Sequence, residues 1–236
     1  MSEVETKLKE LARQLFADSR IDQLLAYETG TLNGRARPCV ITMVDDVERL
    51  VWNNTCSNNL AVYLPGIFAR QPIKPGKPAP EPPKVGIVVK GCDSLSISLL
   101  VKEHQVPRDK LVVIGMPCSG IVSKDSAKIM QSCLECRTPV AKDADFQIEG
   151  ERREISAHPF SSTESFESMA PDERWAYFTE QMNKCIRCYA CRQACPNCYC
   201  PECFAEQTNP KWIGVSSDLS DTMLYHIGRM FHQAGR

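Results

Sequence analysis

Apolar residues near the amino terminus recur at the spacing of a helix. Four fall between charged residues in 3–17: Leu8, Leu11, Leu15 and Phe16. After residue 19 the spacing continues with Ile21, Leu24 and Leu25. Side chains three or four positions apart share one helix face. We therefore predict amphipathic helices in this region that pack on a core.

Strand patterns follow. The stretches 38–44 and 49–52 are short and apolar, and the pair Asp45-Asp46 between them predicts two strands joined by a turn. Residues 84–90 and 111–115 read as buried strands, and 93–103 reads as a helix that begins at Asp93 or Ser94. Strand, helix and strand in this order predict a parallel βαβ unit. The expected fold class is α/β, a small mixed or parallel sheet with flanking helices.

The rest of the chain suggests a second, smaller domain. Seven prolines in 65–84 predict an excursion without helix or interior strand, and 142–170 is polar and reads as a connector. A helix should begin at Pro171 and bury Trp175, Phe178 and Met182. We predict an α/β domain in 1–141, a connector in 142–170, and a helical, ferredoxin-like cysteine-rich segment in 171–236.

The last helix, predicted over 217–234, carries a strongly apolar face. Its members are Leu219, Met223, Ile227, Met230, Phe231 and Ala234. Such a face is typical of core or of a partner interface. His226 and His232 beside it are expected to be surface or interface residues rather than metal ligands.

Seven cysteines lie within 185–203. The first four follow the spacing C-x2-C-x2-C-x3-C-P by which bacterial-type ferredoxins hold a [4Fe-4S] cluster, and they are Cys185, Cys188, Cys191 and Cys195. Structural zinc is the alternative, but zinc usually takes two well-separated pairs. The remaining three, Cys198, Cys200 and Cys203, are expected metal ligands without an assigned partner.

A second group of cysteines should form at the sheet edge. The loops after the two parallel strands carry Cys92 and Cys118, and the pair Cys133 and Cys136 follows a helix expected over 124–131. Carboxyl ends of parallel strands meet at one edge, where ligands gather. Glycines beside these cysteines allow close backbone approach. We predict that these four ligate a second [4Fe-4S] cluster, with four-thiolate zinc as the alternative.

Two further cysteines carry weaker expectations. Cys39 lies inside a predicted strand and should be a small buried apolar residue. Cys56 sits in a polar loop before a helical stretch, and its expected exposure makes it a weaker ligand candidate.

Composition narrows the function classes. The chain has 236 residues, thirteen cysteines and a net charge of −1, with no basic run that would indicate nucleic acid or an acidic membrane. The charged amino terminus lacks the pattern of a secretory signal, and no apolar run is long enough to span a bilayer. Many cysteines without an export signal indicate thiolate ligands in a reducing cytoplasm.

Four stretches together resemble a known family. They are Lys90-Gly91-Cys92-Asp93, residues 114–120, residues 133–136 and residues 185–204. They are similar to the beta subunits of coenzyme F-420 (deazaflavin) hydrogenases and dehydrogenases, in the form with a ferredoxin-type domain that is associated with formate dehydrogenase and heterodisulfide reductase complexes. The resemblance covers roughly residues 30–236. It implies an electron-transfer or flavin-linked oxidoreductase subunit of an anaerobe's cytoplasmic complex.

The sequence departs from that family in one respect. Relatives usually carry a second ferredoxin run after a helix like 225–234, and this chain ends at Arg236. In two-cluster ferredoxins the fourth cysteine of one run ligates the other cluster. Three explanations stay open for Cys195: a truncated chain, a partner that completes the site, or a local solution with the last three cysteines.

Three functions follow from these observations. The first is an iron-sulfur electron carrier that relays electrons to a partner subunit, with no catalytic residues of its own. The second is a flavin-linked dehydrogenase or hydrogenase beta subunit with FAD, although no Gly-x-Gly-x-x-Gly run is present. The third is an assembly module whose cysteines bind zinc.

Overall fold

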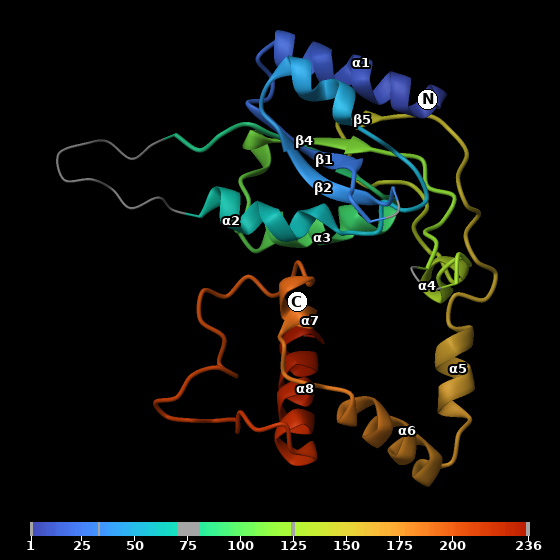
Figure 1. The fold of residues 1–236 in the computed structure, drawn as a ribbon, viewed down its shortest axis with the longest axis vertical. Coiled ribbons are helices and arrows are strands. Elements are labelled where there is room, and N and C mark those ends of the chain that lie inside the picture. Colours follow the sequence, from blue (N-terminus) through green and yellow to red (C-terminus); the bar gives the residue numbers. More distant parts are fainter. Residues whose placement is uncertain (1, 33, 70–80, 124–125, 235–236) are drawn as a thin grey trace, which may run out of the picture. The chain divides into compact units, whose positions relative to one another are not determined.

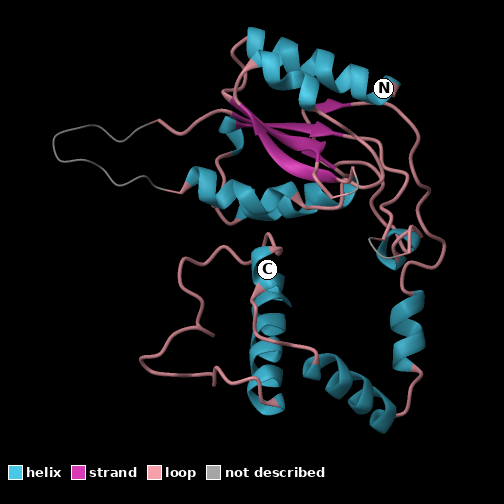
Figure 2. Ribbon diagram, in the orientation of Figure 1, coloured by secondary structure: helices cyan, strands magenta, loops and turns pink. Residues whose placement is uncertain are grey.

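The computed structural model describes residues 2–32, 34–69, 81–123 and 126–234. It divides into two compact units, Met1–Pro159 and Phe160–Arg236. Figure 1 traces the chain through both, and Figure 2 shows that the strands gather in the first unit while the second is helical. Each unit is described by itself.

The first unit is built on a five-stranded mixed sheet in the order β2-β1-β3-β4-β5. The strands are β1 (Gln23–Thr29), β2 (Ala36–Ile41), β3 (Val85–Val89), β4 (Leu111–Gly115) and β5 (Phe146–Gln147). Among the strand pairs that the structure describes, β1–β2 is antiparallel and the other three are parallel. All five residues of β3 and of β4 are buried, as expected for parallel strands covered on both faces. The predicted α/β class and the βαβ unit are confirmed.

Helices cover the two faces of this sheet. α1 (Glu3–Ala17) lies on one face, and α2 (Leu64–Phe68) and α3 (Gly91–Lys102) lie on the other (Figure 1). A capping box between Ser2 and Glu5 begins α1. Its Leu8, Ala12 and Leu15 join the core with the inward side chains of the sheet. Short 3-10 helices span Val44–Arg49, Leu60–Tyr63 and Arg108–Lys110.

Two sequence predictions near the amino terminus were wrong. Residues 21–25 do not extend the first helix, because Leu24 and Leu25 belong to β1, where Leu24 to Tyr27 are all buried. A strand covered on both faces loses its alternation and can imitate a helix pattern. The stretch 49–52 is no strand either, since Leu50 forms only a bridge with Glu28, and β2 pairs with β1 instead.

Other boundaries also differ. Pro65 stands in the first turn of α2, where a missing N–H costs no hydrogen bond, so helix enters the predicted excursion; residues 70–80 lie outside the described part. The helix expected over 124–131 is not seen among its described residues, and α4 (Gln131–Leu134) is a single turn. The segment read as a connector supplies β5 and also α5 (Ser161–Glu167).

The second unit contains α5, α6 (Pro171–Asn183), α7 (Ala190–Gln193) and α8 (Leu219–Ala234). The predicted helix start at Pro171 is confirmed. The expected burial on α6 is not, because Trp175 and Phe178 are largely exposed. Phe178 instead packs edge-on against Phe166, with ring centroids 5.3 Å apart. Within the described chain, no helix is both long and apolar enough to cross a membrane.

The predicted helix at the carboxyl end is confirmed, but its buried face is a different one. On α8 the buried residues are Thr222 and Tyr225, while Met230 and Phe231 are exposed. Tyr225 forms a small core with Ala205 and Ile213. The polar side of α8 therefore faces the cysteine-rich segment, and the apolar stripe does not.

One buried carboxylate ties the antiparallel edge of the sheet together. Glu28 on β1 is about 10 % exposed and forms ion pairs with Arg37 of β2 and with Arg49, at 2.7 and 2.5 Å. Burial by itself would raise the pKa of Glu28, but the hydrogen bonds and charges of Arg49 and Arg37 outweigh it and lower this pKa. The ionised carboxylate is thus the form that stabilises the fold.

We predict that Glu28→Gln lowers the free energy of unfolding by ~1 kcal/mol at neutral pH, because two charged hydrogen bonds lose their anionic acceptor. A carboxyl with a lowered folded pKa stabilises above its unfolded pKa, and this contribution is lost as pH falls through the folded pKa. The difference between the two proteins should therefore shrink below about pH 4. Urea unfolding at several pH values measures it.

The matched control is Glu3→Gln, which removes an exposed carboxylate paired with the exposed Lys7. Exposed pairs contribute little, so this change should stay within ~0.5 kcal/mol of the parent. An equal loss in both variants would contradict a special role for Glu28.

Candidate functional site

The first candidate site lies where β3 and β4 end. The two strands are parallel and in register from Val85 opposite Leu111 to Val89 opposite Gly115. Cys92 follows β3 in the first turn of α3, and Cys118 follows β4 by three residues. Parallel pairing thus brings these two cysteines, 26 positions apart in sequence, to one edge of the sheet.

A close approach at Gly91 brings the Cys133–Cys136 segment to the same place. A Cβ at Gly91 would lie 2.0 Å from the carbonyl oxygen of Thr138, which no real side chain tolerates. The start of α3, with Cys92 next to Gly91, therefore packs directly on the backbone that follows Cys136. Only glycine permits this contact.

Gly120 turns the chain at a second contact between these segments. Its φ of +113° is a conformation that other residues rarely adopt, and a Cβ there would lie 3.7 Å from the Cβ of Cys133. The next amide, of Ile121, donates a hydrogen bond to Cys133 Sγ at 3.4 Å. The loop that carries Cys118 is thus folded against the turn that carries Cys133.

The four thiols act on one another electrostatically. Burial raises the pKa of the Cys118 thiol, and the neighbouring thiols of Cys133 and Cys136 raise it further. Burial of Cys92 Sγ is the largest cause that raises the pKa of this thiol, and the charges of Asp93, Cys118 and Cys133 raise it further. The residue as a whole still keeps an exposed surface. Among the described residues, no group of three or more His, Cys, Asp or Glu side chains has a geometry ready to hold a metal ion. The four are gathered as thiols and not arranged as a closed ligand shell.

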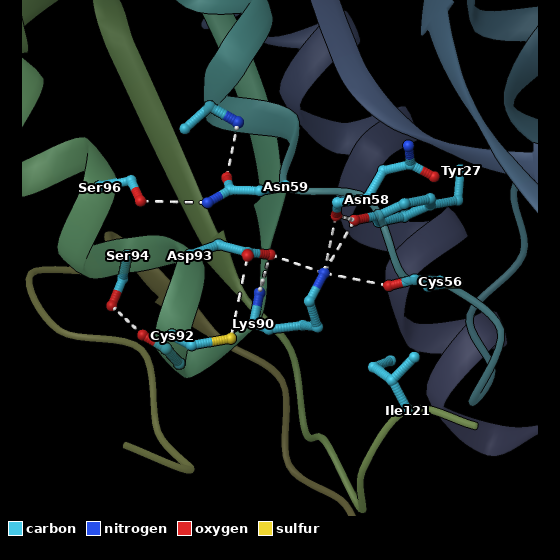
Figure 3. A network of polar contacts seen from close by, with 12 residues as sticks. Tyr27, Cys56, Asn58, Asn59, Lys90, Cys92, Asp93, Ser94, Ser96 and Ile121 are labelled. Carbon is cyan, nitrogen blue, oxygen red and sulfur yellow. Dashed lines mark hydrogen bonds and ion pairs between the residues drawn. The ribbon is translucent and has the colours of Figure 1, made fainter. Parts of the chain in front are cut away.

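A buried lysine lies beside these thiols. Lys90 is 3 % exposed, and its Nζ is 2.7 Å from Asp93 Oδ2 and 3.0 Å from the Tyr27 hydroxyl. It also donates to the carbonyl oxygens of Cys56 and Asn58, at 3.0 and 2.9 Å. Figure 3 shows the ammonium at the centre of these oxygens. Burial alone would lower the pKa of Lys90, but Asp93 and Tyr27 outweigh it and raise this pKa, so the group stays charged.

Further hydrogen bonds fix the surrounding loops. The indole Nε1 of Trp52 donates to the carbonyl of Pro117 at 2.8 Å, directly before Cys118. The Ser94 hydroxyl donates to the Gly91 carbonyl at 2.7 Å and accepts from the amide of Lys142 at 2.9 Å. Cys118 also lines a surface cavity together with Trp52 and Gly120. One side of the thiol group therefore remains open to solvent.

Cys39 and Cys56 behave as buried residues. The prediction for Cys39 is confirmed, since it is 8 % exposed in β2. The expected exposure of Cys56 was wrong, because the residue is fully buried and burial raises its thiol pKa to about 11. Its carbonyl is held by Lys90. A polar loop can still be buried when its backbone supplies hydrogen-bond acceptors to a buried cation.

The second candidate site lies in the other unit, along α8. The imidazole Nε2 of His226 is 3.4 Å from Cys185 Sγ, and the Tyr225 hydroxyl is 3.9 Å from Cys191 Sγ. Further along the helix, Gln233 Nε2 donates to Cys195 Sγ at 3.2 Å and to Cys198 Sγ at 3.5 Å. His226, expected to be a surface or interface residue, is thus half-buried against a candidate ligand. Cys188 is exposed.

Sequence reasoning missed the side chains that support these thiols. Lys90 directly follows five apolar strand residues, and a charged residue at the end of a buried strand is a signal that could have pointed to a buried charge. Nothing in the sequence singles out Tyr27 or Gln233, because their partners are 63 and 38 positions away. Chemically, both sites offer soft thiolate donors, the set that suits iron-sulfur clusters or zinc.

Comparison with known proteins gives a partial relative. No protein-family model matches the chain. In an alignment 148 residues long that covers 56 % of this chain, it is 26 % identical to a protein named "F420-dependent formate dehydrogenase 1 subunit beta" from Methanococcus maripaludis. The aligned part is 37 % of that relative's length. This distant, partial similarity supports the resemblance to beta subunits of this kind.

Proposed function

We propose that the chain is an iron-sulfur electron-transfer subunit of an oxidoreductase complex of the formate dehydrogenase, hydrogenase or heterodisulfide reductase type. The observation that carries the proposal is the presence of two separate groups of thiols, one in each unit, each backed by its own hydrogen-bonding frame. The similarity to a formate dehydrogenase beta subunit supports it.

In this proposal Cys92, Cys118, Cys133 and Cys136 hold one [4Fe-4S] cluster, and Cys185, Cys188 and Cys191 supply thiolates to another. A cluster of this kind takes up and releases single electrons at a potential tuned by hydrogen bonds, charge and burial. The chain's own residues hold the ligand loops. Neither holding a cluster nor transferring an electron requires a general base or a nucleophile.

Charge and hydrogen bonding at the first site suit an anionic group. Four thiolates concentrate negative charge, and the Lys90 ammonium and the amino-terminal end of α3 lie beside them. The amide of Ile121 already donates to a sulfur, the kind of contact that tunes a cluster. The Lys90 network also fixes residues 56–58 against α3, which limits movement of the neighbouring loops.

We expect anaerobically purified wild-type chain to carry about eight iron and about eight acid-labile sulfide, with reduced-cluster signals in electron paramagnetic resonance after dithionite. Cys118→Ser and Cys188→Ser should each lower the iron to about four, because each removes a ligand of a different cluster. Iron, sulfide and zinc analysis with the resonance spectrum measures this.

Cys39→Ser is the matched control, since this cysteine is buried within β2 and belongs to neither group. Its iron content should equal that of the wild type. Zinc without iron in the wild type would end the electron-transfer proposal and leave the zinc assembly module. A yellow protein that releases flavin would point instead to the flavin-linked beta subunit.

The Gly91 contact allows a second prediction. Gly91→Ala places a methyl group on the Thr138 carbonyl and should push residues 133–138 away from Cys92. We expect iron to fall to about half and the free energy of unfolding to drop by ~1–3 kcal/mol, the usual cost of overpacking. Iron analysis and thermal unfolding of the same preparation test both effects.

Gly66→Ala is the control for this substitution. Gly66 lies in α2, and nothing lies within 4 Å of an added Cβ. Its iron content should match that of the wild type. Its stability should match or exceed that of the wild type, since alanine is the better helix former. Full iron in Gly91→Ala would show that the contact does not organise the site.

A further inference from the structure

Four cysteines in 195–203 form a group of which the ferredoxin spacing includes only the first. They are Cys195, Cys198, Cys200 and Cys203, two Cys-x2-Cys pairs separated by a single residue. The amide of Cys198 donates to the carbonyl of Cys195 at 3.0 Å, which closes a tight turn between the first two. Their sulfurs accept from the same nitrogen, Gln233 Nε2. Cys195 and Cys198 therefore lie side by side.

The other two cysteines join this pair at one cavity. Cys198, Cys200 and Cys203 line a small cavity against α8, together with Gln233 and Arg229. The aromatic ring of Phe204 packs on His232 of the same helix, with centroids 5.4 Å apart, and this contact anchors the chain just after Cys203. All four thiols are thus gathered near the carboxyl end of α8.

This group is displaced from the first three cysteines of the run. Cys185 contacts His226, whereas Cys195 contacts Gln233, seven positions further along α8. Seven residues of helix correspond to ~10 Å. Cys195 therefore lies with the later cysteines, and Cys185 and Cys191 lie with His226 and Tyr225.

Two arginines line the cavity, and one of them, Arg192, is ion-paired with Glu206. The other is Arg229, and Arg192 also donates to the carbonyl of Cys200 at 3.3 Å. The Nε of Arg229 is buried and has no hydrogen-bond partner in the part of the chain that the structure describes. A buried donor without an acceptor is costly, and a sulfur anion in this cavity would satisfy it. A four-thiolate site with a divalent ion carries that negative charge.

The spacing selects the kind of metal. The short spacing of Cys198 and Cys200 favours a single tetrahedral ion, which needs sulfurs only ~3.8 Å apart, from zinc–sulfur bonds of about 2.3 Å. Each Cys-x2-Cys pair has the ligand spacing of a zinc site, although the two pairs here lie closer together in sequence than those of most zinc sites. Residues 195–206 contain turns and no helix or strand, so binding requires only a local loop movement.

We propose that Cys195, Cys198, Cys200 and Cys203 bind one zinc ion, as a site separate from Cys185, Cys188 and Cys191. The ion fixes this loop on α8 and transfers no electrons. Cys195 then does not ligate the cluster of its own ferredoxin run. This site is independent of the proposed iron-sulfur function, and either can fail alone.

The test begins with the wild-type chain, purified anaerobically in full length. We expect about one zinc per chain, and a zinc X-ray absorption spectrum with four sulfur neighbours at about 2.3 Å. This measurement needs no variant and therefore does not depend on how a variant folds. A zinc shell that contains nitrogen or oxygen, or no zinc at all, would overturn the proposal.

Variants assign the zinc to its ligands. Cys200→Ser and Cys203→Ser should each lose at least tenfold of the bound zinc while iron stays at the wild-type value. Cys118→Ser should lose iron and keep its zinc, which excludes the site in the other unit as the zinc carrier. Zinc that survives Cys200→Ser, or iron that falls with it, would refute the assignment. Iron absent from the wild type, with zinc present, refutes only the electron-transfer function.

Discussion

A buried ammonium group organises the first unit of this protein. Lys90 is surrounded by the Asp93 carboxylate, the Tyr27 hydroxyl and two backbone carbonyls of residues 56 and 58. Removing a charge from water costs several kcal/mol, so each oxygen must be held in place. The need for these partners fixes three elements at once: β1, the loop before α2 and the start of α3. The same contacts hold the thiol-bearing loops after β3 and β4 in place.

Two glycines allow the close packing that brings the thiol-bearing segments of the first unit together. Gly91 allows the backbone near Cys136 to touch α3, and Gly120 turns the chain so that Cys133 meets the loop of Cys118. Because a backbone contact at Gly91 cannot yield as a flexible side chain can, the spacing between the two segments is closely defined. A soft-donor site assembled from four distant positions needs this kind of support.

In the second unit, one face of α8 supports the cysteine-bearing segment. Polar residues of α8 contact thiols at two levels, His226 with Cys185 and Gln233 with Cys195 and Cys198. One helix thereby contacts the cysteine-rich segment at two separate levels. The exposed apolar stripe with Met230 and Phe231 takes no part in these contacts. Helical spacing predicted the helix, while contacts with the cysteine-rich loop selected its buried side.

The sequence by itself determined the elements whose signal is local. β3, α3 and β4 follow from apolar runs and helical spacing, although α3 begins at Gly91 and not at the predicted Asp93 or Ser94. The cysteine spacing is read directly from the sequence. Parallel pairing then predicts that Cys92 and Cys118 meet at one edge. Tertiary structure alone decided that residues 23–29 form a strand, that Cys56 is buried and that Lys90 meets Tyr27. These outcomes depend on contacts between positions far apart in the chain, and periodicity within a short window carries no information about such contacts.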